Sequence, residues 1–269
     1  MKTASCCVQQ ALEGAMGPLK SFRRAIMFSG GFDSMLIAAL ALRLGSKLTA
    51  VTVRFDDFNP ITVQGAVESA EILGLDHLII DVKAVEFLSA FEALAGLTDE
   101  PILDLDLAIV YAALKKYDPK VTGNVFISGM GSDQWMGDLA LQENPGGLAA
   151  RRHQARMDEE AHHRVAQSQG CEILFPFLSE PMLALSQEIP ADMKKDKKLL
   201  RDLGRVFSIP HRAARIEQQV PSLMRDILIR TYGDRAWPGP VDLKDKTQSP
   251  EDQLLRQIVQ GLWMEKRKG

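Results

Sequence analysis

Short apolar runs alternate with helical patterns through the first half of the chain, and this alternation restricts the fold more than any other feature. Continuous apolar or β-branched runs of this length are typical of strands buried on both faces of a parallel sheet. The patterns Ser34–Leu44 and Thr62–Leu73 each end at a glycine and predict helices. The predicted strands are Ala25–Phe28, Leu48–Val53, Leu78–Val82 and Val125–Ile127.

Strand–helix–strand units of this length connect through right-handed crossovers, and ligands bind beyond the carboxyl ends of their strands. We therefore predict an α/β fold, a doubly wound parallel sheet followed by a mainly helical lobe. Three segments are expected: an N-terminal helical extension (1–22), an α/β domain (23–145) and a helical lobe (146–269). The lobe begins after the loop at 144–147 and has no convincing strand pattern. Its expected helices are Arg151–Gln169, Met182–Glu188, Lys194–Phe207, Pro221–Thr231 and Pro250–Glu265.

Composition narrows the class of protein. The 269 residues are 46% hydrophobic and 25% charged, which is typical of a globular protein. A net charge of -3 and a pI near 6.0 give no overall reason to expect nucleic acid or an anionic membrane as partner, although local basic patches are compatible with them. The longest apolar stretch, Met35–Leu42, is far shorter than the roughly 20 residues that span a bilayer.

Cysteine usage indicates the compartment. Cys6, Cys7 and Cys171 form neither a disulfide framework nor a Cys-x-x-Cys pair. We therefore expect a cytoplasmic protein, without membrane insertion. The sequence is compatible with a homo-oligomer.

The junction between the first strand and the first helix carries the strongest functional signal. There the chain reads Ser-Gly-Gly-Phe-Asp-Ser over Ser29–Ser34. A glycine turn that opens a helix aims backbone N–H groups at an anion, so this loop can hold pyrophosphate without a lysine. A plain tight turn is the alternative for the Ser-Gly-Gly part alone. The sequence has no Gly-x-x-x-x-Gly-Lys-Ser/Thr, which excludes the ordinary P-loop nucleotide site.

The complete Ser29–Ser34 string resembles the signature of the N-type ATP pyrophosphatases, or PP-loop enzymes. Further blocks resemble the synthetase domain of asparagine synthetases, in the same order along the chain. Together they cover residues from about 23 to 215. The blocks are Asp99-Glu100-Pro101 with Asp104 and Tyr111, Val125–Asp138 with Gln134 in place of the usual Glu, Cys171–Leu178 with Ser179 in place of the usual Asp, and Lys198–Arg201.

The resemblance implies an adenine nucleotide alpha hydrolase-like fold that binds ATP and Mg²⁺. Two carboxylates at the sheet edge can hold an octahedral Mg²⁺ together with triphosphate oxygens, and the resemblance assigns Asp33 and Asp133 to this role. Capping of a helix N-terminus is the alternative for either aspartate. The implied nucleotide-binding residues are Ser29, Gly30, Gly31, Asp33, Ser34 and Gly129 at the phosphates, with Val51 and Val53 at the adenine.

Catalytic roles are implied in the same way. Glu100 matches the family acid that orients or deprotonates the nucleophile, with a solvated loop glutamate as the alternative. Lys198 and Arg201 are candidates for stabilising charge on the α-phosphoryl group. The family lysine that normally follows a Leu-Pro pair is absent after Ile209-Pro210, where Arg215 is the candidate substitute.

The expected activity is an ATP-dependent ligase that forms AMP and pyrophosphate, adenylates a carboxylate or similar oxygen, and transfers it to ammonia or an amine. The short segment after Cys6 and Cys7 leaves no room for the family's glutaminase domain, which predicts a stand-alone synthetase domain and leaves a role for a separate glutaminase subunit. Two alternatives stay open. One is a PP-loop sulfurtransferase or tRNA-modifying enzyme; the other is a non-catalytic module that binds ATP or AMP.

Overall fold

The computed structural model describes residues 4–17, 23–56, 60–101, 103–133, 145–210, 219–239 and 249–268. Its strands form a five-stranded sheet in the order β3-β2-β1-β4-β5. β1 pairs in parallel with both β2 and β4, and β4 pairs in parallel with β5. The strands are β1 (Arg23–Met27), β2 (Lys47–Phe55), β3 (Asp76–Val82), β4 (Val125–Ser128) and β5 (Glu172–Leu174).

Helices separate these strands along the chain. α2 and α3 connect the first three strands, and α9 connects β4 to β5. The helices are α1 (Ala4–Ala15), α2 (Phe32–Arg43), α3 (Pro60–Leu73), α4 (Ala84–Leu97), α5 (Leu105–Leu114), α6 (Pro119–Thr122), α9 (Pro145–Ser168), α10 (Glu180–Glu188), α11 (Ala191–Lys194), α12 (Lys198–Val206), α13 (Gln219–Tyr232) and α14 (Pro250–Lys268), with 3₁₀ turns η1 (Pro176–Leu178), η2 (Lys195–Lys197) and η3 (Gly233–Arg235).

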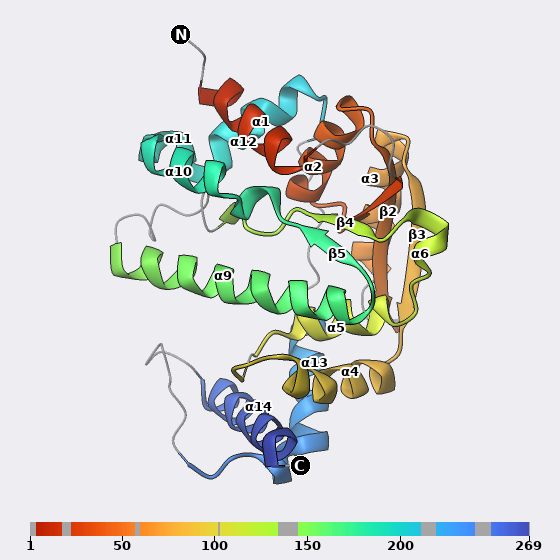
Figure 1. The fold of residues 1–269 in the computed structure, drawn as a ribbon, viewed down its shortest axis with the longest axis vertical. Helices are drawn as coiled ribbons and strands as arrows, with labels where there is room; N and C mark the ends of the chain where they lie inside the picture. The colour runs from red at the N-terminus through yellow and green to blue at the C-terminus, as the bar shows by residue number, and fades with distance from the viewer. Residues whose placement is uncertain are drawn as a thin grey trace. The chain divides into compact units, whose positions relative to one another are not determined.

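The strand order makes the sheet doubly wound. From β1 at the centre the chain runs outward through β2 to β3, and it later adds β4 and β5 on the other side of β1. Because parallel crossovers are right-handed, α2 and α3 lie on one face of the sheet and α9 on the other (Figure 1). The winding reverses between β1 and β4, and ligands of such sheets bind at this reversal.

The structure confirms the predicted fold class and most of its elements. All four predicted strands are present, and the two predicted helices appear as α2 and α3. The prediction that no strand follows residue 147 is wrong, because β5 pairs with β4 at the edge of the sheet. β5 has only three residues, too few to show a strand pattern. The helix predicted over Lys194–Phe207 is also interrupted, since η2 separates α11 from α12.

The chain forms two compact units that do not follow the three predicted segments. The first contains residues 1–52, 61–79 and 118–216, and the second contains 53–60, 80–117 and 217–269. The first unit has a core of fully buried apolar side chains from the central strands and α2, among them Ile26, Leu36, Leu40 and Phe126. Full burial of one such side chain stabilises the folded state by about 1.5–3 kcal/mol relative to leaving it exposed.

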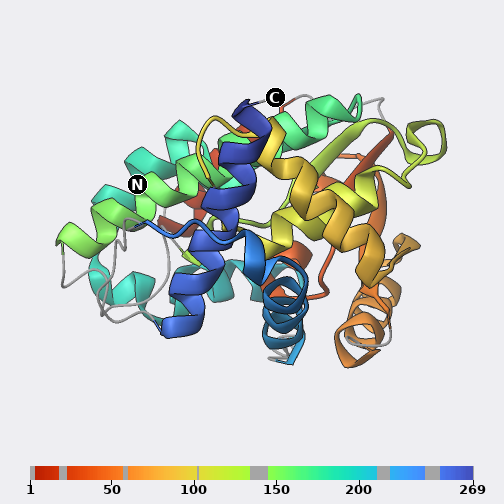
Figure 2. The same cartoon turned by 90° about the horizontal axis from the view of Figure 1, so that it is seen from below.

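In the second unit, α14 lies beside α4 and α13 (Figure 2). Aromatic rings line the junction: Phe87 packs against Phe91, and Phe91 stacks on Tyr232 with ring centroids 6.5 Å apart. The Trp263 Nε1–H donates to the carbonyl of Thr98, 3.2 Å away. This unit therefore has an apolar core of its own, closed at one end by a hydrogen bond from α14 to the end of α4.

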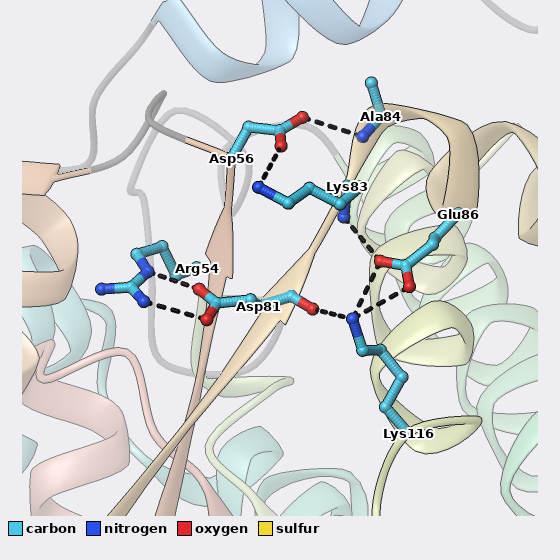
Figure 3. A network of polar contacts seen from close by, with 7 residues as sticks. All are labelled: Arg54, Asp56, Asp81, Lys83, Ala84, Glu86 and Lys116. Atoms are coloured by element: carbon cyan, nitrogen blue, oxygen red, sulfur yellow. Dashed lines mark hydrogen bonds and ion pairs between the residues drawn. The ribbon is translucent and has the colours of Figure 1, made fainter.

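A network of charged residues fixes the start of α4 in the second unit (Figure 3). Glu86 accepts a hydrogen bond from the backbone N–H of Lys83 at 2.7 Å and contacts the Lys116 ammonium at 2.9 Å. Asp56 accepts from the Ala84 N–H at 2.8 Å. The hydrogen bond from Lys83 and the nearby Lys116 lower the pKa of Glu86 below its ordinary range. These contacts satisfy amide groups that a helix N-terminus leaves unpaired.

None of the described helices combines the length and the apolar character needed to cross a lipid bilayer.

Candidate active site

The loops that follow β1 and β4 meet at the point where the sheet reverses its winding. The two strands are neighbours, with Met27 paired to Ser128 at their carboxyl ends. α2 begins at Phe32, so its N-terminus opens directly onto this edge of the sheet. An anion placed here would face the first amide groups of α2 and the positive end of its dipole.

Two serines close the loop after β1. The Gly31 N–H donates to Ser29 Oγ at 3.2 Å, and Ser34 Oγ donates to the Gly31 carbonyl at 2.9 Å. Gly31, the N-cap of α2, is a glycine and supplies no side-chain hydrogen bond to the first amide groups of the helix. These first amide groups can donate to an anion, and their role in holding phosphate stays a prediction.

Two glycines allow this loop to pack tightly. Gly30 has a φ of +70°, and a Cβ there would lie 2.6 Å from the Cα of Ala66. Gly129, in the loop after β4, approaches the backbone of the other loop so closely that a Cβ would lie 2.9 Å from the nitrogen of Ser34. Real Cβ atoms do not make such contacts, so both positions require glycine. The two loops therefore touch backbone to backbone.

Asp33 and Asp133 converge on one cation, the ammonium group of Lys197. Lys197 Nζ lies 2.7 Å from Asp33 Oδ2 and 2.8 Å from Asp133 Oδ1. It also donates to Ser132 Oγ at 2.8 Å. The structure thus brings together the two aspartates that the sequence analysis assigned to a metal, and it places a lysine side chain on both of them.

The donor set fits a divalent cation of the hard type. Asp33 Oδ1 is buried and accepts no hydrogen bond from any described group, which leaves a carboxylate oxygen for a further partner. Asp133 is 67% exposed and can turn toward a ligand. No cluster of three or more potential ligand side chains occurs among the described residues. Mg²⁺ commonly binds through one or two carboxylates and completes its shell with phosphate oxygens and water, so two aspartates suffice.

Lys197 and Ser132 were missed by the sequence analysis. Lys197 is the N-cap residue of α12 and has the left-handed conformation, with φ 54° and ψ 32°. The predicted neighbours Lys198 and Arg201 are both exposed. The available signal was the lysine-rich run 194–198, but a run of like residues does not show which one turns inward. The catalytic roles of Lys198 and Arg201 stay predictions.

Glu100 lies in the second unit, on a segment held by α14. Thr98 and Asp99 offer backbone carbonyls to the guanidinium of Arg267, which donates to them at 3.4 and 3.2 Å. The Glu100 side chain itself is exposed. Asp104, from the same predicted block, caps α5 by accepting from the Leu107 N–H at 2.9 Å. The catalytic assignment of Glu100 stays a prediction.

Some of the remaining predicted residues are described by the structure, and others are not. Val51 is buried and its carbonyl already accepts the Phe28 N–H at 2.8 Å, while Val53 is half-buried, and the adenine assignment of both stays a prediction. Ser179, at the position of the usual aspartate, donates its hydroxyl to the Pro176 carbonyl at 2.8 Å. Arg215 and Gln134 lie outside the described residues.

The family of this chain follows from comparison with known proteins. Residues 9–167, more than half of the chain, match the sequence profile named asparagine synthase, and the chain belongs to the asparagine synthase family. This membership confirms the resemblance drawn from the sequence blocks. The sheet order confirms the predicted adenine nucleotide alpha hydrolase-like architecture.

Curated relatives cover part of the chain. Putative glutamine-hydrolyzing asparagine synthetases of Mycobacterium bovis and Mycobacterium tuberculosis are each 33% identical over 117 residues, which is 44% of this chain and only 18% of theirs. Asparagine synthetase 1 of Bacillus subtilis is 26% identical over 117 residues, again 18% of its length. A 7-cyano-7-deazaguanine synthase of Chromohalobacter salexigens is 24% identical over 90 residues, which is 34% of this chain and 36% of that protein.

Similar solved structures are more distant. The U34-tRNA thiolase NcsA of Methanococcus maripaludis aligns with 97% of this chain and 78% of its own, at 14% identity and a TM-score of 0.47. The NMN synthetase of Francisella tularensis aligns with 90% of this chain and 97% of its own, at 14% identity and a TM-score of 0.39.

Proposed function

We propose that this protein binds ATP at the loops after β1 and β4 and cleaves it between the α and β phosphates to activate a carboxylate for amide formation. Family membership supports ATP use. The observation that supports the proposal is the close backbone contact between Gly129, after β4, and Ser34, in the first turn of α2, which brings the segments after both strands together where we propose that phosphate binds. The Asp33 and Asp133 carboxylates lie on the segments that follow these two strands.

The proposed reaction has two steps. A carboxylate oxygen of the substrate attacks the α-phosphorus, the bond to the bridging oxygen breaks, and pyrophosphate leaves. The nitrogen of ammonia or an amine then attacks the acyl carbon, AMP leaves, and the nitrogen loses a proton. In this scheme Glu100 orients or deprotonates the nitrogen nucleophile.

The chain's own residues have defined roles in the first step. The N–H groups at the start of α2 and the Ser29 and Ser34 hydroxyls hold the β and γ phosphates as one leaving group. Asp33 and Asp133 would hold Mg²⁺, which neutralises phosphate charge when it is bound. Because no Walker lysine is present, the loop favours departure of pyrophosphate over transfer of the γ-phosphate.

A labelled substrate screen tests the proposal. Candidate carboxylates, each with ¹⁸O in the carboxyl group, are incubated with ATP, Mg²⁺ and either ammonia or a set of amines, and released pyrophosphate is measured. Attack at the α-phosphorus predicts that one ¹⁸O atom appears in AMP for each amide formed. Amide formation with ¹⁸O in inorganic phosphate would instead show an acyl phosphate and contradict the proposal.

The similarity to 7-cyano-7-deazaguanine synthase favours a second candidate substrate class. In this alternative the activated oxygen belongs to a substituent on a deazaguanine-type base rather than to an aliphatic carboxylate. Sulfur delivery from Cys171 has less support, because the thiol is only 5% exposed and burial raises its pKa, which disfavours the reactive thiolate. Bases of the deazaguanine type therefore belong in the same screen.

A further inference from the structure

The contacts of Lys197 carry an inference about the order in which ligands bind. Its side chain is 19% exposed, and its ammonium group contacts oxygens of Asp33, Ser132 and Asp133. An ammonium has three N–H donors, and these three contacts use all of them. Without a ligand, the charge of Lys197 is therefore committed to the pair of carboxylates that the proposed function assigns to Mg²⁺.

The local charge balance disfavours a metal ion that arrives alone. Two carboxylates and one ammonium sum to a charge of about −1. A bare divalent ion would have to displace the ammonium from oxygens 2.7 and 2.8 Å away, and it would leave two cations beside each other. A metal–nucleotide complex brings phosphate charge that compensates both cations.

At Lys197 the backbone has an uncommon conformation, and a change in it would move the side chain. A left-handed conformation is uncommon for a lysine, and here it lies at the break between η2 and α12. The polar contacts of the side chain help to hold this conformation.

We propose that Lys197 is an internal counter-cation that occupies the Asp33–Asp133 pair in the nucleotide-free protein and must leave it before a divalent ion enters. The consequence is that metal binds together with nucleotide and not before it. This inference rests on the proposed function in one respect, the assignment of the two aspartates to a metal.

Manganese binding without nucleotide tests the inference on the full chain. The affinity for Mn²⁺ is measured by electron paramagnetic resonance for the wild type, Lys197→Met and Lys197→Gln. We expect weak binding by the wild type and a gain of about tenfold or more in both variants, because removal of a positive charge at this distance exceeds about 1.4 kcal/mol in a partly buried site. The double variant Lys197→Met with Asp33→Asn should lose the gain.

Lys195→Met is the matched control, since Lys195 is exposed on η2 two positions away. It should bind Mn²⁺ as the wild type does. Circular dichroism verifies folding, and Lys197→Gln retains a hydrogen-bond donor for Ser132 in case the Met variant does not fold. If neither folded variant binds Mn²⁺ more than about twofold tighter than the wild type, Lys197 is merely a structural ion-pair partner and the inference is overturned.

A second measurement distinguishes a failure of this inference from a failure of the proposed function. Mn²⁺ binding is repeated with a non-hydrolysable ATP analogue, for which the wild type and the Lys197 variants should all bind the ion. Absence of binding in every protein would overturn the metal assignment and the inference with it. Metal binding as expected, in a protein that forms no AMP, would contradict the proposed reaction and leave the role of Lys197 standing.

Discussion

Gly30 and Gly129 determine how closely the loops after β1 and β4 pack against the helices beside them, Gly30 against α3 and Gly129 against the first turn of α2. Both positions lack the space for a Cβ, and at each the obstacle is backbone rather than the end of a flexible side chain. Relief of such a clash requires that the loop move relative to the helix against which it packs. Phosphate recognition through N–H groups depends on their exact direction, so movement of a few tenths of an ångström affects binding.

Gly129→Ala should therefore weaken ATP binding by about tenfold or more and destabilise the fold by roughly 1–3 kcal/mol, the usual cost of overpacking. Calorimetric titration with ATP and urea unfolding measure the two effects. Gly96→Ala is the control, because a Cβ added at Gly96 in α4 would meet nothing within 4 Å. An equal effect of the two substitutions would refute the steric explanation.

Asp33→Asn should lower the affinity for Mg-ATP by about tenfold, since the amide removes one charged ligand of the proposed metal site. The same affinity measured without divalent ions should change less. Asp76→Asn, at an exposed position at the start of β3, serves as the control. Unchanged Mg-ATP affinity in a folded Asp33→Asn protein would remove the metal assignment.

Glu100→Gln should leave nucleotide affinity near that of the wild type and lower turnover by about 10²–10⁴, the contribution of a positioned base. The amide retains the shape of the side chain and loses its basicity. Steady-state assays with the substrate found in the screen measure this, with the exposed Glu71→Gln as control. Wild-type turnover in the Glu100 variant would show that Glu100 is an ordinary loop residue.

At the scale of elements, the sequence predicted those parts of the site that depend on backbone pattern. The strand, the glycine turn and the helix over residues 25–44 leave few alternatives, and β1, its loop and α2 form as expected. The sequence could not show which lysine in a run of lysines would turn its side chain toward the site. Lys194, Lys195, Lys197 and Lys198 are close in sequence, and only the left-handed turn at Lys197 decides which of them reaches the aspartates. β5 was missed because pairing with β4, and not its own composition, makes it a strand.

The network at the start of α4 should make stability depend on pH. The pKa of Glu86 is lowered from 4.5, chiefly by the hydrogen bond from Lys83. The stabilisation is therefore complete above pH 4.5 and is lost as the pH falls through the lower pKa of the folded state. Urea unfolding should show Glu86→Gln to be less stable than the wild type at about pH 7, by at most about 1 kcal/mol because the ion pair is more than a third exposed.

The difference between Glu86→Gln and the wild type should shrink as the pH is lowered toward about 3, since a protonated Glu86 resembles glutamine. Glu71→Gln should show no such convergence, because Glu71 lies outside the network. A difference that stays constant from about pH 7 to about pH 3 would mean that the charge of Glu86 does not stabilise the fold.

At the scale of the whole molecule, the proposed site lies within both the doubly wound sheet and the part of the chain that matches the family. The sheet reverses between β1 and β4, and the matched residues 9–167 include both strands and both loops. Glu100 lies in the second unit, and the residues of the proposed phosphate and metal contacts lie in the first. The account's central claim is that ATP is cleaved between its α and β phosphates.

Phosphorus NMR of a turnover mixture tests this claim most directly, because it distinguishes AMP, pyrophosphate, ADP and inorganic phosphate in one spectrum. The full chain is incubated with ATP, Mg²⁺ and the accepted substrates, and Asp33→Asn is run in parallel. We expect AMP and pyrophosphate in equal amounts from the wild type and a much slower reaction from the variant. ADP and inorganic phosphate as the main products, formed by the wild type and lost in Asp33→Asn, would contradict the claim.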